Sequence, residues 1–115
     1  MPRIAPFLVL VLAACAATPP PLPAPAPVSY QGLDAVMGRS ADVALALVGP
    51  SNLDRREGEA RQLQFAGACV LDIFYLPPPG GNLPVATHAD ARRPDGSAMP
   101  PGECLTLLQQ ARSKP

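Results

Sequence analysis

The chain has 115 residues and carries 9 lysines and arginines against 9 aspartates and glutamates, which gives a formal net charge of zero. This balance argues against nucleic acid as a partner, because duplex-binding proteins neutralise phosphates with clustered basic side chains, whereas Arg55-Arg56 and Arg92-Arg93 each lie close to acidic residues. The length allows one small domain with a modest core.

The first fourteen residues have the layout of a signal peptide. One basic residue, Arg3, precedes an apolar stretch from Ile4 to Leu12 that only Pro6 interrupts. A membrane-spanning helix needs about 20 apolar residues, and this stretch has roughly half of that number, so we do not expect it to span a membrane. Residues 1–14 are therefore predicted to be a lipoprotein signal peptide.

The motif Leu12-Ala13-Ala14-Cys15 resembles a bacterial lipobox, in which the cysteine becomes the lipid-bearing first residue of the mature protein. This resemblance implies that acylated Cys15 holds the protein stably in the lipid bilayer. An aspartate after such a cysteine favours the inner membrane, and this chain has Ala16, so the periplasmic face of the outer membrane is the expected location. An ordinary secretory signal with a cysteine near its cleavage site is the alternative.

A proline-rich segment follows the lipobox from Ala16 to Pro27. Proline fixes φ and lacks an N–H group, so this segment is expected to run as polyproline II. At about 3.1 Å per residue it would form a semi-rigid spacer of roughly 35 to 40 Å. Residues 15–29 are predicted to be the lipidated cysteine and its tether; a proline-rich ligand for a partner's groove is the alternative.

Two thiols remain once Cys15 is lipidated, and an oxidising periplasm would pair Cys69 with Cys104. A bridge that closes a loop of this size contributes roughly 3.5 to 4 kcal/mol in the chain-entropy model, a large share of a small domain's stability. A catalytic redox pair is the alternative, but the spacing is not Cys-x-x-Cys and no basic cluster adjoins either thiol.

The remaining residues, 30–115, are predicted to form one small periplasmic α+β domain. Apolar residues at helical spacing predict a short first helix from Gln31 to Met37. A second helix from Ala41 to Val48 would begin at the N-cap Ser40 and end at Gly49-Pro50, because glycine commonly follows the last helical residue and proline cannot continue a helix.

Extended segments follow the second helix. The segment Leu53 to Glu57 is either a strand or a loop, and Gly58-Glu59 is a turn. Alternation of apolar and polar residues predicts antiparallel strands at Arg61 to Ala66, at Cys69 to Leu76 in the centre, and at Pro84 to Arg92, with a loop at 77–82 and a Pro94-Asp95-Gly96 turn. A C-terminal helix from Pro101 to Arg112 is expected to be joined to the central strand through Cys104.

The order of motifs resembles the small lipoproteins of the outer-membrane barrel-assembly complex (BamE, also called SmpA/OmlA). The resemblance is carried by Val36-Met37-Gly38-Arg39-Ser40, by Asp42-Val43 and by Leu47-Val48-Gly49-Pro50, followed by a strand meander. It implies an α+β fold: two short N-terminal helices packed on a three- to four-stranded antiparallel sheet. The C-terminal helix tied by a disulfide is an addition to that pattern. The same two-layer fold serves β-lactamase-inhibitor-type binding modules, so the fold alone does not select a function.

Catalytic and metal sites have little support in the sequence. His88 and Asp90 lie on one strand face and form half of a triad, but no Gly-x-Ser-x-Gly elbow or other marked nucleophile accompanies them. One histidine and scattered carboxylates do not make a metal site, and the acids Glu57 and Glu59 fit a solvated turn better than glycoside cleavage. We therefore expect a protein that is not an enzyme and that carries no cofactor.

These observations predict an outer-membrane lipoprotein whose periplasmic domain binds another envelope protein and supports envelope assembly or integrity. The binding surface is expected on the sheet face that carries Gln62, Gln64 and His88, or on an open edge strand near Leu53 to Glu57. A periplasmic inhibitor or sensor module, which would bind an enzyme or a small ligand, is the alternative. An envelope hydrolase that uses His88 and Asp90 is the third.

Overall fold

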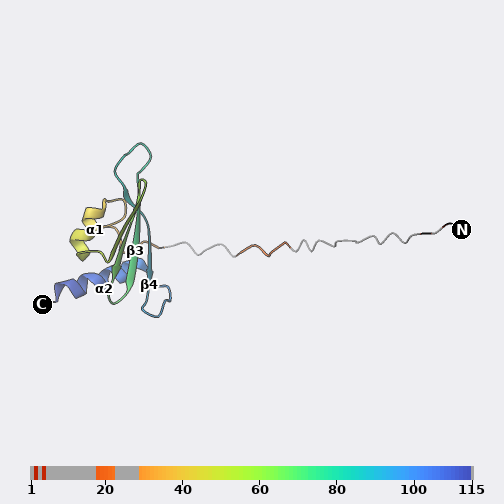
Figure 1. The fold of residues 1–115 in the computed structure, drawn as a ribbon. Coiled ribbons are helices and arrows are strands. Elements are labelled where there is room, and N and C mark those ends of the chain that lie inside the picture. Colours follow the sequence, from red (N-terminus) through yellow and green to blue (C-terminus); the bar gives the residue numbers. More distant parts are fainter. Residues whose placement is uncertain (1, 3, 5–17, 23–28, 115) are drawn as a thin grey trace.

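The computed structural model describes residue 2, residue 4 and residues 18–22 and 29–114. Its elements in chain order are α1 (Ala41–Val48), β1 (Leu53–Glu57), β2 (Ala60–Ala66), β3 (Val70–Leu76), β4 (Val85–Arg92) and α2 (Pro101–Ser113). The strands form one antiparallel sheet in the order β1-β2-β3-β4, and both helices lie on the same side of it (Figure 1). The fold is α+β, as predicted. Cys15 and nearly all of the predicted signal peptide lie outside the described residues.

The helix expected from Gln31 to Met37 is not formed, so only one of the two helices precedes the sheet. Gly32 has a φ of 86°, which is incompatible with a right-handed helix, and the segment consists of consecutive turns. The spacing of its apolar residues, which predicted a helix, has another cause. Leu33 is fully buried, and Met37 forms a parallel bridge with Ala86 at the outer edge of β4. The predicted arrangement with two N-terminal helices is therefore wrong.

Helix α1 has the predicted bounds, and its two ends are stabilised differently. Ser40 occupies the N-cap position, but its side chain makes no capping hydrogen bond. At the other end Gly49 has a φ of 102° and donates its N–H to the carbonyl of Leu45 at 2.9 Å. Arg112 of α2 donates a hydrogen bond to the carbonyl of Ala46, a favourable place for a cation because helix C-termini carry partial negative charge.

The segment Leu53–Glu57, which the sequence left open between strand and loop, is strand β1. It pairs with β2 through a hairpin in which Glu57 lies opposite Ala60 and only Gly58 and Glu59 intervene. Gly58 has a φ of 56°, the sign that a type II′ turn requires at its first central position. All five residues of β1 are exposed, in contrast to β3 at the centre of the sheet.

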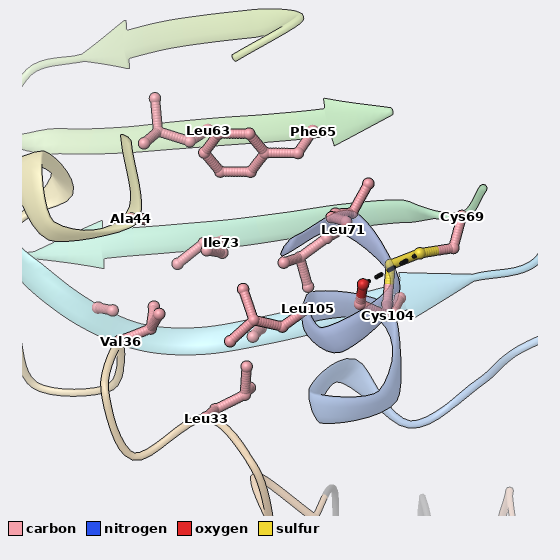
Figure 2. Close-up of a cluster of buried hydrophobic side chains, with 14 of the residues drawn as sticks. Leu33, Val36, Ala44, Leu63, Phe65, Cys69, Leu71, Ile73, Cys104 and Leu105 are labelled. Atoms are coloured by element: carbon pink, nitrogen blue, oxygen red, sulfur yellow. Dashed lines mark hydrogen bonds between the residues drawn. A yellow bond between two sulfur atoms is a disulfide. The ribbon is translucent and has the colours of Figure 1, made fainter. Parts of the chain in front are cut away.

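The core lies between the helix-covered side of the sheet, the two helices and the segment 33–36. Alternate residues of β2 and β3 supply its largest side chains, as the period of two predicts. Its members include Leu33, Val36, Ala44, Leu63, Phe65, Leu71, Ile73, Tyr75, Ala89, Cys104 and Leu105, and Figure 2 shows most of them facing one another. The sheet therefore carries the core on one side, and no helix among the described residues covers its other side.

Cys69 and Cys104 form the predicted disulfide, with their Cα atoms 5.8 Å apart and a sequence separation of 35. The bridge joins the residue before β3 to the first turns of α2 (Figure 2). Nearby, Gly102 of α2 lies so close to the backbone of Gln31 that a Cβ at position 102 would be 1.9 Å from the Gln31 carbonyl oxygen. The disulfide therefore holds α2 against the start of β3, and the backbone contact holds the start of the domain against α2.

Candidate protein-binding surface

The side of the sheet that faces away from both helices is the first candidate surface of the domain. We call it the outer face; it is formed by Gln62, Gln64, Val70, Asp72, Phe74, His88, Asp90 and Arg92, which alternate with the core residues along β2, β3 and β4. Among the described residues, neither helix covers it (Figure 1). Soluble sheets often leave one face solvated, so the identity of the side chains on this face decides what it can do.

A carboxylate lies at the centre of the outer face. Asp72 is only 7 % exposed, and its Oδ1 atom accepts hydrogen bonds from Nε2 of Gln62 at 3.1 Å and from Nε2 of Gln64 at 2.8 Å. The guanidinium of Arg92 lies 3.9 Å from Oδ2 of Asp72. A buried carboxylate must be compensated by donors, and these three partners from β2 and β4 compensate it. Two glutamine side chains are thereby fixed on an otherwise solvent-facing surface.

An aromatic cluster of Tyr30, Phe74 and His88 lies next to this network. The phenol oxygen of Tyr30 is 2.6 Å from Nδ1 of His88, and the two rings meet edge to face with centroids 6.1 Å apart. The ring of Phe74 also contacts this cluster, with its centroid 5.5 Å from that of His88. When Nδ1 is unprotonated it accepts the hydrogen of Tyr30, which leaves the rest of the imidazole available to a partner.

The structure places the three residues proposed from the sequence, Gln62, Gln64 and His88, on this one face. Gln62 and His88 also share a row across the sheet, because Phe74 pairs with both of them. Sequence reasoning missed Tyr30, Phe74 and Asp72 as parts of the surface. Asp72 is the residue that could have indicated this surface from the sequence. It is the only charged residue in the apolar run of β3, and it lies on the face away from the core.

The candidate catalytic and metal-binding residues are not brought together into a site. His88 has Tyr30 as its hydrogen-bond partner, and Asp90 is exposed two residues further along β4. Glu57 forms an exposed ion pair with Arg55 at 2.7 Å, and Glu59 lies in the hairpin turn. Within the part of the chain that the structure describes, no three His, Cys, Asp or Glu side chains are placed to hold a metal ion.

The two edges of the sheet form the other candidate surfaces. At β4, Ala86 donates to the carbonyl of Arg39 at 2.9 Å and accepts from the N–H of Gly38 at 2.8 Å. Towards its end β4 also bridges to the segment 97–99, so much of this edge is covered. At β1, no described segment pairs with the strand on the side away from β2. The free edge near Leu53 to Glu57 is therefore present as expected.

A hollow of about 370 Å³ lies where the start of α1, the β1–β2 turn and the segment 82–84 meet. Arg61 at its wall donates two hydrogen bonds to Asp54, at 2.9 and 2.7 Å. Its wall combines the exposed charged side chains of Asp42, Arg56 and Glu59 with the apolar residues Ala41, Ala60, Leu83 and Pro84. Ligand sites are concave and mostly apolar with a few polar groups, so this hollow is the feature of the domain that bears on the alternative of a small-ligand sensor.

Comparison of the chain with protein-family models, with curated proteins and with solved structures gave no match. None of the helices among the described residues has the length and apolar character needed to cross a membrane.

Proposed function

We propose that this chain is an outer-membrane lipoprotein whose periplasmic domain binds another envelope protein through the outer face, and that this binding supports envelope assembly or integrity. One observation carries the proposal. The outer face combines a fixed polar network with an aromatic cluster, and neither helix of the described chain covers it. The lipobox resemblance at Cys15 supports the location, and the motif resemblance to the barrel-assembly lipoproteins supports the process.

The polar network favours binding because its side chains are already ordered. Immobilising a flexible side chain at an interface costs about 0.5–1.5 kcal/mol, and Gln62 and Gln64 are held by Asp72 before any partner arrives. Their carbonyl oxygens remain available as acceptors, since the amide nitrogens make the bonds to Asp72. A partner therefore meets a surface with defined hydrogen-bonding positions.

The aromatic cluster supplies the apolar part of such an interface. Aromatic side chains are enriched at the centres of protein interfaces, where they bury a large area with few rotatable bonds. Phe74 lies in the middle of the sheet, and Tyr30 lies where the domain follows the predicted tether. The tether would then join the domain beside its binding surface. That surface would lie at the end of the domain that is nearest the membrane, where membrane-associated partners are found.

The direct test is site-specific crosslinking in cells. Full-length chain carries a photo-reactive phenylalanine analogue at Phe74, or at Arg39 as an exposed control position away from the outer face. We expect a discrete crosslinked product from position 74 only, and mass spectrometry of that product to identify an envelope protein. Equal labelling from both positions, or no product from position 74, would overturn the proposal.

Deletion of the gene separates assembly from inhibition. Loss of an assembly or integrity factor should admit large hydrophobic antibiotics through an impaired outer membrane. A periplasmic inhibitor predicts no such change. His88→Ala separates the hydrolase alternative: a null phenotype with intact crosslinking at Phe74 would support catalysis, whereas reduced crosslinking would support binding.

A further inference from the structure

The edge of β1 that faces away from β2, with which no described segment pairs, presents a defined set of backbone groups. The β1–β2 hairpin closes at Glu57 and Ala60 around a two-residue turn, so this closing pair exchanges hydrogen bonds. Antiparallel pairs alternate between bonded and non-bonded along a ladder. The N–H and C=O groups of Asp54 and Arg56 therefore point away from β2, towards solvent. An added strand would bond to these two residues.

We propose that the occupant of this edge is β1 of a second copy of the chain, running antiparallel, with Asp54 of each copy opposite Arg56 of the other. The twofold axis then passes through the pair formed by Arg55 and its counterpart. Both outward-pointing residues of each strand are used, and the two sheets join into one continuous sheet. This inference goes beyond the proposed function and does not depend on it.

In this register the charged side chains of one β1 strand are complementary to those of the β1 strand of the second copy. Asp54 is kept ionised by Arg61, whose hydrogen bonds hold the pKa of the Asp54 carboxyl below its usual value. Arg56 has no ion-pair partner among the described residues, so it is available to Asp54 of the second copy. Opposite charges directly across a strand pair stabilise the pairing, and here the favourable pair occurs twice.

The like charges at the axis are compensated within each copy. Arg55 and its counterpart would be direct neighbours on the outer-face side of the joined sheet. Each Arg55 donates to Glu57 of its own strand at 2.7 Å and so brings a carboxylate with it. Both side chains are more than half exposed, and water screens the remaining repulsion.

The neighbouring registers are less favourable. Centring the axis on Asp54 places two carboxylates opposite each other and requires the N–H of Asn52, which already donates to Gln64 at 2.8 Å. Centring it on Arg56 places two guanidiniums opposite each other and leaves the second bonded pair to Gly58 in the turn. Like charges directly opposite destabilise a strand pair. One register is thus selected among the three that the outward-pointing groups permit.

Disulfide trapping tests this register with single substitutions. At the axis, position 55 faces itself in a non-bonded antiparallel pair, where Cβ atoms are close enough for a disulfide. Full-length Arg55→Cys is expected to give a covalent dimer on mild oxidation. Leu53→Cys is the matched control, because position 53 is exposed on the same strand and side but would face position 57 of the other copy. The parent chain, which contains Cys15, sets the background.

A charge change then tests whether the pairing of Asp54 with Arg56 stabilises the dimer. Arg56→Glu added to Arg55→Cys places two carboxylates opposite each other at both bonded pairs, and we expect several-fold less covalent dimer. Arg39→Glu added to Arg55→Cys makes the same charge change at an exposed position away from β1 and should leave the dimer unchanged.

Four results would overturn the inference: equal dimer from Arg55→Cys and Leu53→Cys, dimer instead from Arg56→Cys, no dimer above background, or insensitivity to Arg56→Glu. Crosslinking from Phe74 to an envelope protein is measured separately, so either proposal can fail while the other stands. A band in which Arg55→Cys is joined to a different protein, with no dimer, would assign the edge to a partner strand.

Discussion

The two faces of the sheet are formed by the same strands but carry side chains of opposite character. On the covered face, β3 contributes Leu71, Ile73 and Tyr75, each fully buried against the helices or the segment 33–36. On the outer face the same strand contributes Asp72, which lies between Gln64 and Asp90, and Phe74, which lies between Gln62 and His88. The covered face is thus a continuous apolar core, whereas the outer face holds ordered polar and aromatic groups.

The largest expected effect concerns the covered face and its disulfide. Replacing both cysteines, Cys69→Ala with Cys104→Ala, removes a bridge across 35 residues, which the chain-entropy model values at about 4 kcal/mol. A domain of this size has only about 5 kcal/mol or slightly more to lose. We expect the urea midpoint to fall close to zero denaturant. An unchanged midpoint would mean that α2 is held by its apolar contacts alone.

Truncation at two positions of β3 that lie on opposite faces compares the faces directly. Leu71→Ala opens a cavity in the core and should cost about 2–5 kcal/mol, because a buried side chain is lost and the surroundings relax only partly. Phe74→Ala removes a half-buried ring from the outer face and should cost about 1 kcal/mol. Urea unfolding of both variants measures the two losses. Equal losses would mean that the outer face is also core.

Substitution of Asp72 tests whether the outer-face network stabilises the fold or only orders the surface. Asp72→Ala should cost about 1–3 kcal/mol, since hydrogen bonds to a charged group are lost and two amides must find water. Gln64→Ala should cost less than about 1 kcal/mol, because Gln62 still bonds the carboxylate. Thermal unfolding of the two variants provides the comparison. If Asp72→Ala is neutral, the network exists only for binding.

The elements that the sequence predicted correctly are those set by local rules. Alternation placed Leu63 and Phe65 on one face, the Gly49-Pro50 sequence ended α1, and the two available thiols defined the disulfide. Each of these features depends on a short window or on a count of residues. The sheet and the C-terminal helix followed from such features without knowledge of tertiary contacts.

The errors arose where distant contacts override local pattern. The spacing of Leu33 and Val36 suggested a helix, but Gly32 adopts a positive φ and Met37 is recruited to the edge of β4, almost fifty residues away in the chain. The network around Asp72 likewise depends on the β2–β3 register, which periodicity does not give. An alternating pattern shows which residues share a face but not which of them are neighbours.

The smallest effect concerns a polar group on the covered face. Tyr75 is fully buried, and its hydroxyl has no hydrogen-bond partner among the described residues, so burial raises the pKa of Tyr75 to about 12. The unfolded chain releases this proton near pH 10, as an ordinary tyrosine does. Between pH 10 and 12 the folded state therefore binds more protons than the unfolded state, and stability falls as the pH rises.

Tyr75→Phe should remove this contribution. At pH 8 the variant is expected to equal or exceed the parent by about 1 kcal/mol, because the unpaired hydroxyl is no longer desolvated. At pH 11 its advantage should grow by roughly another 1 kcal/mol, since only the parent gains from releasing a proton on unfolding. Urea midpoints at the two pH values measure both differences. A loss of more than about 1 kcal/mol at pH 8 would show that the hydroxyl is hydrogen-bonded in solution, which would make the covered face as dependent on polar contacts as the outer face.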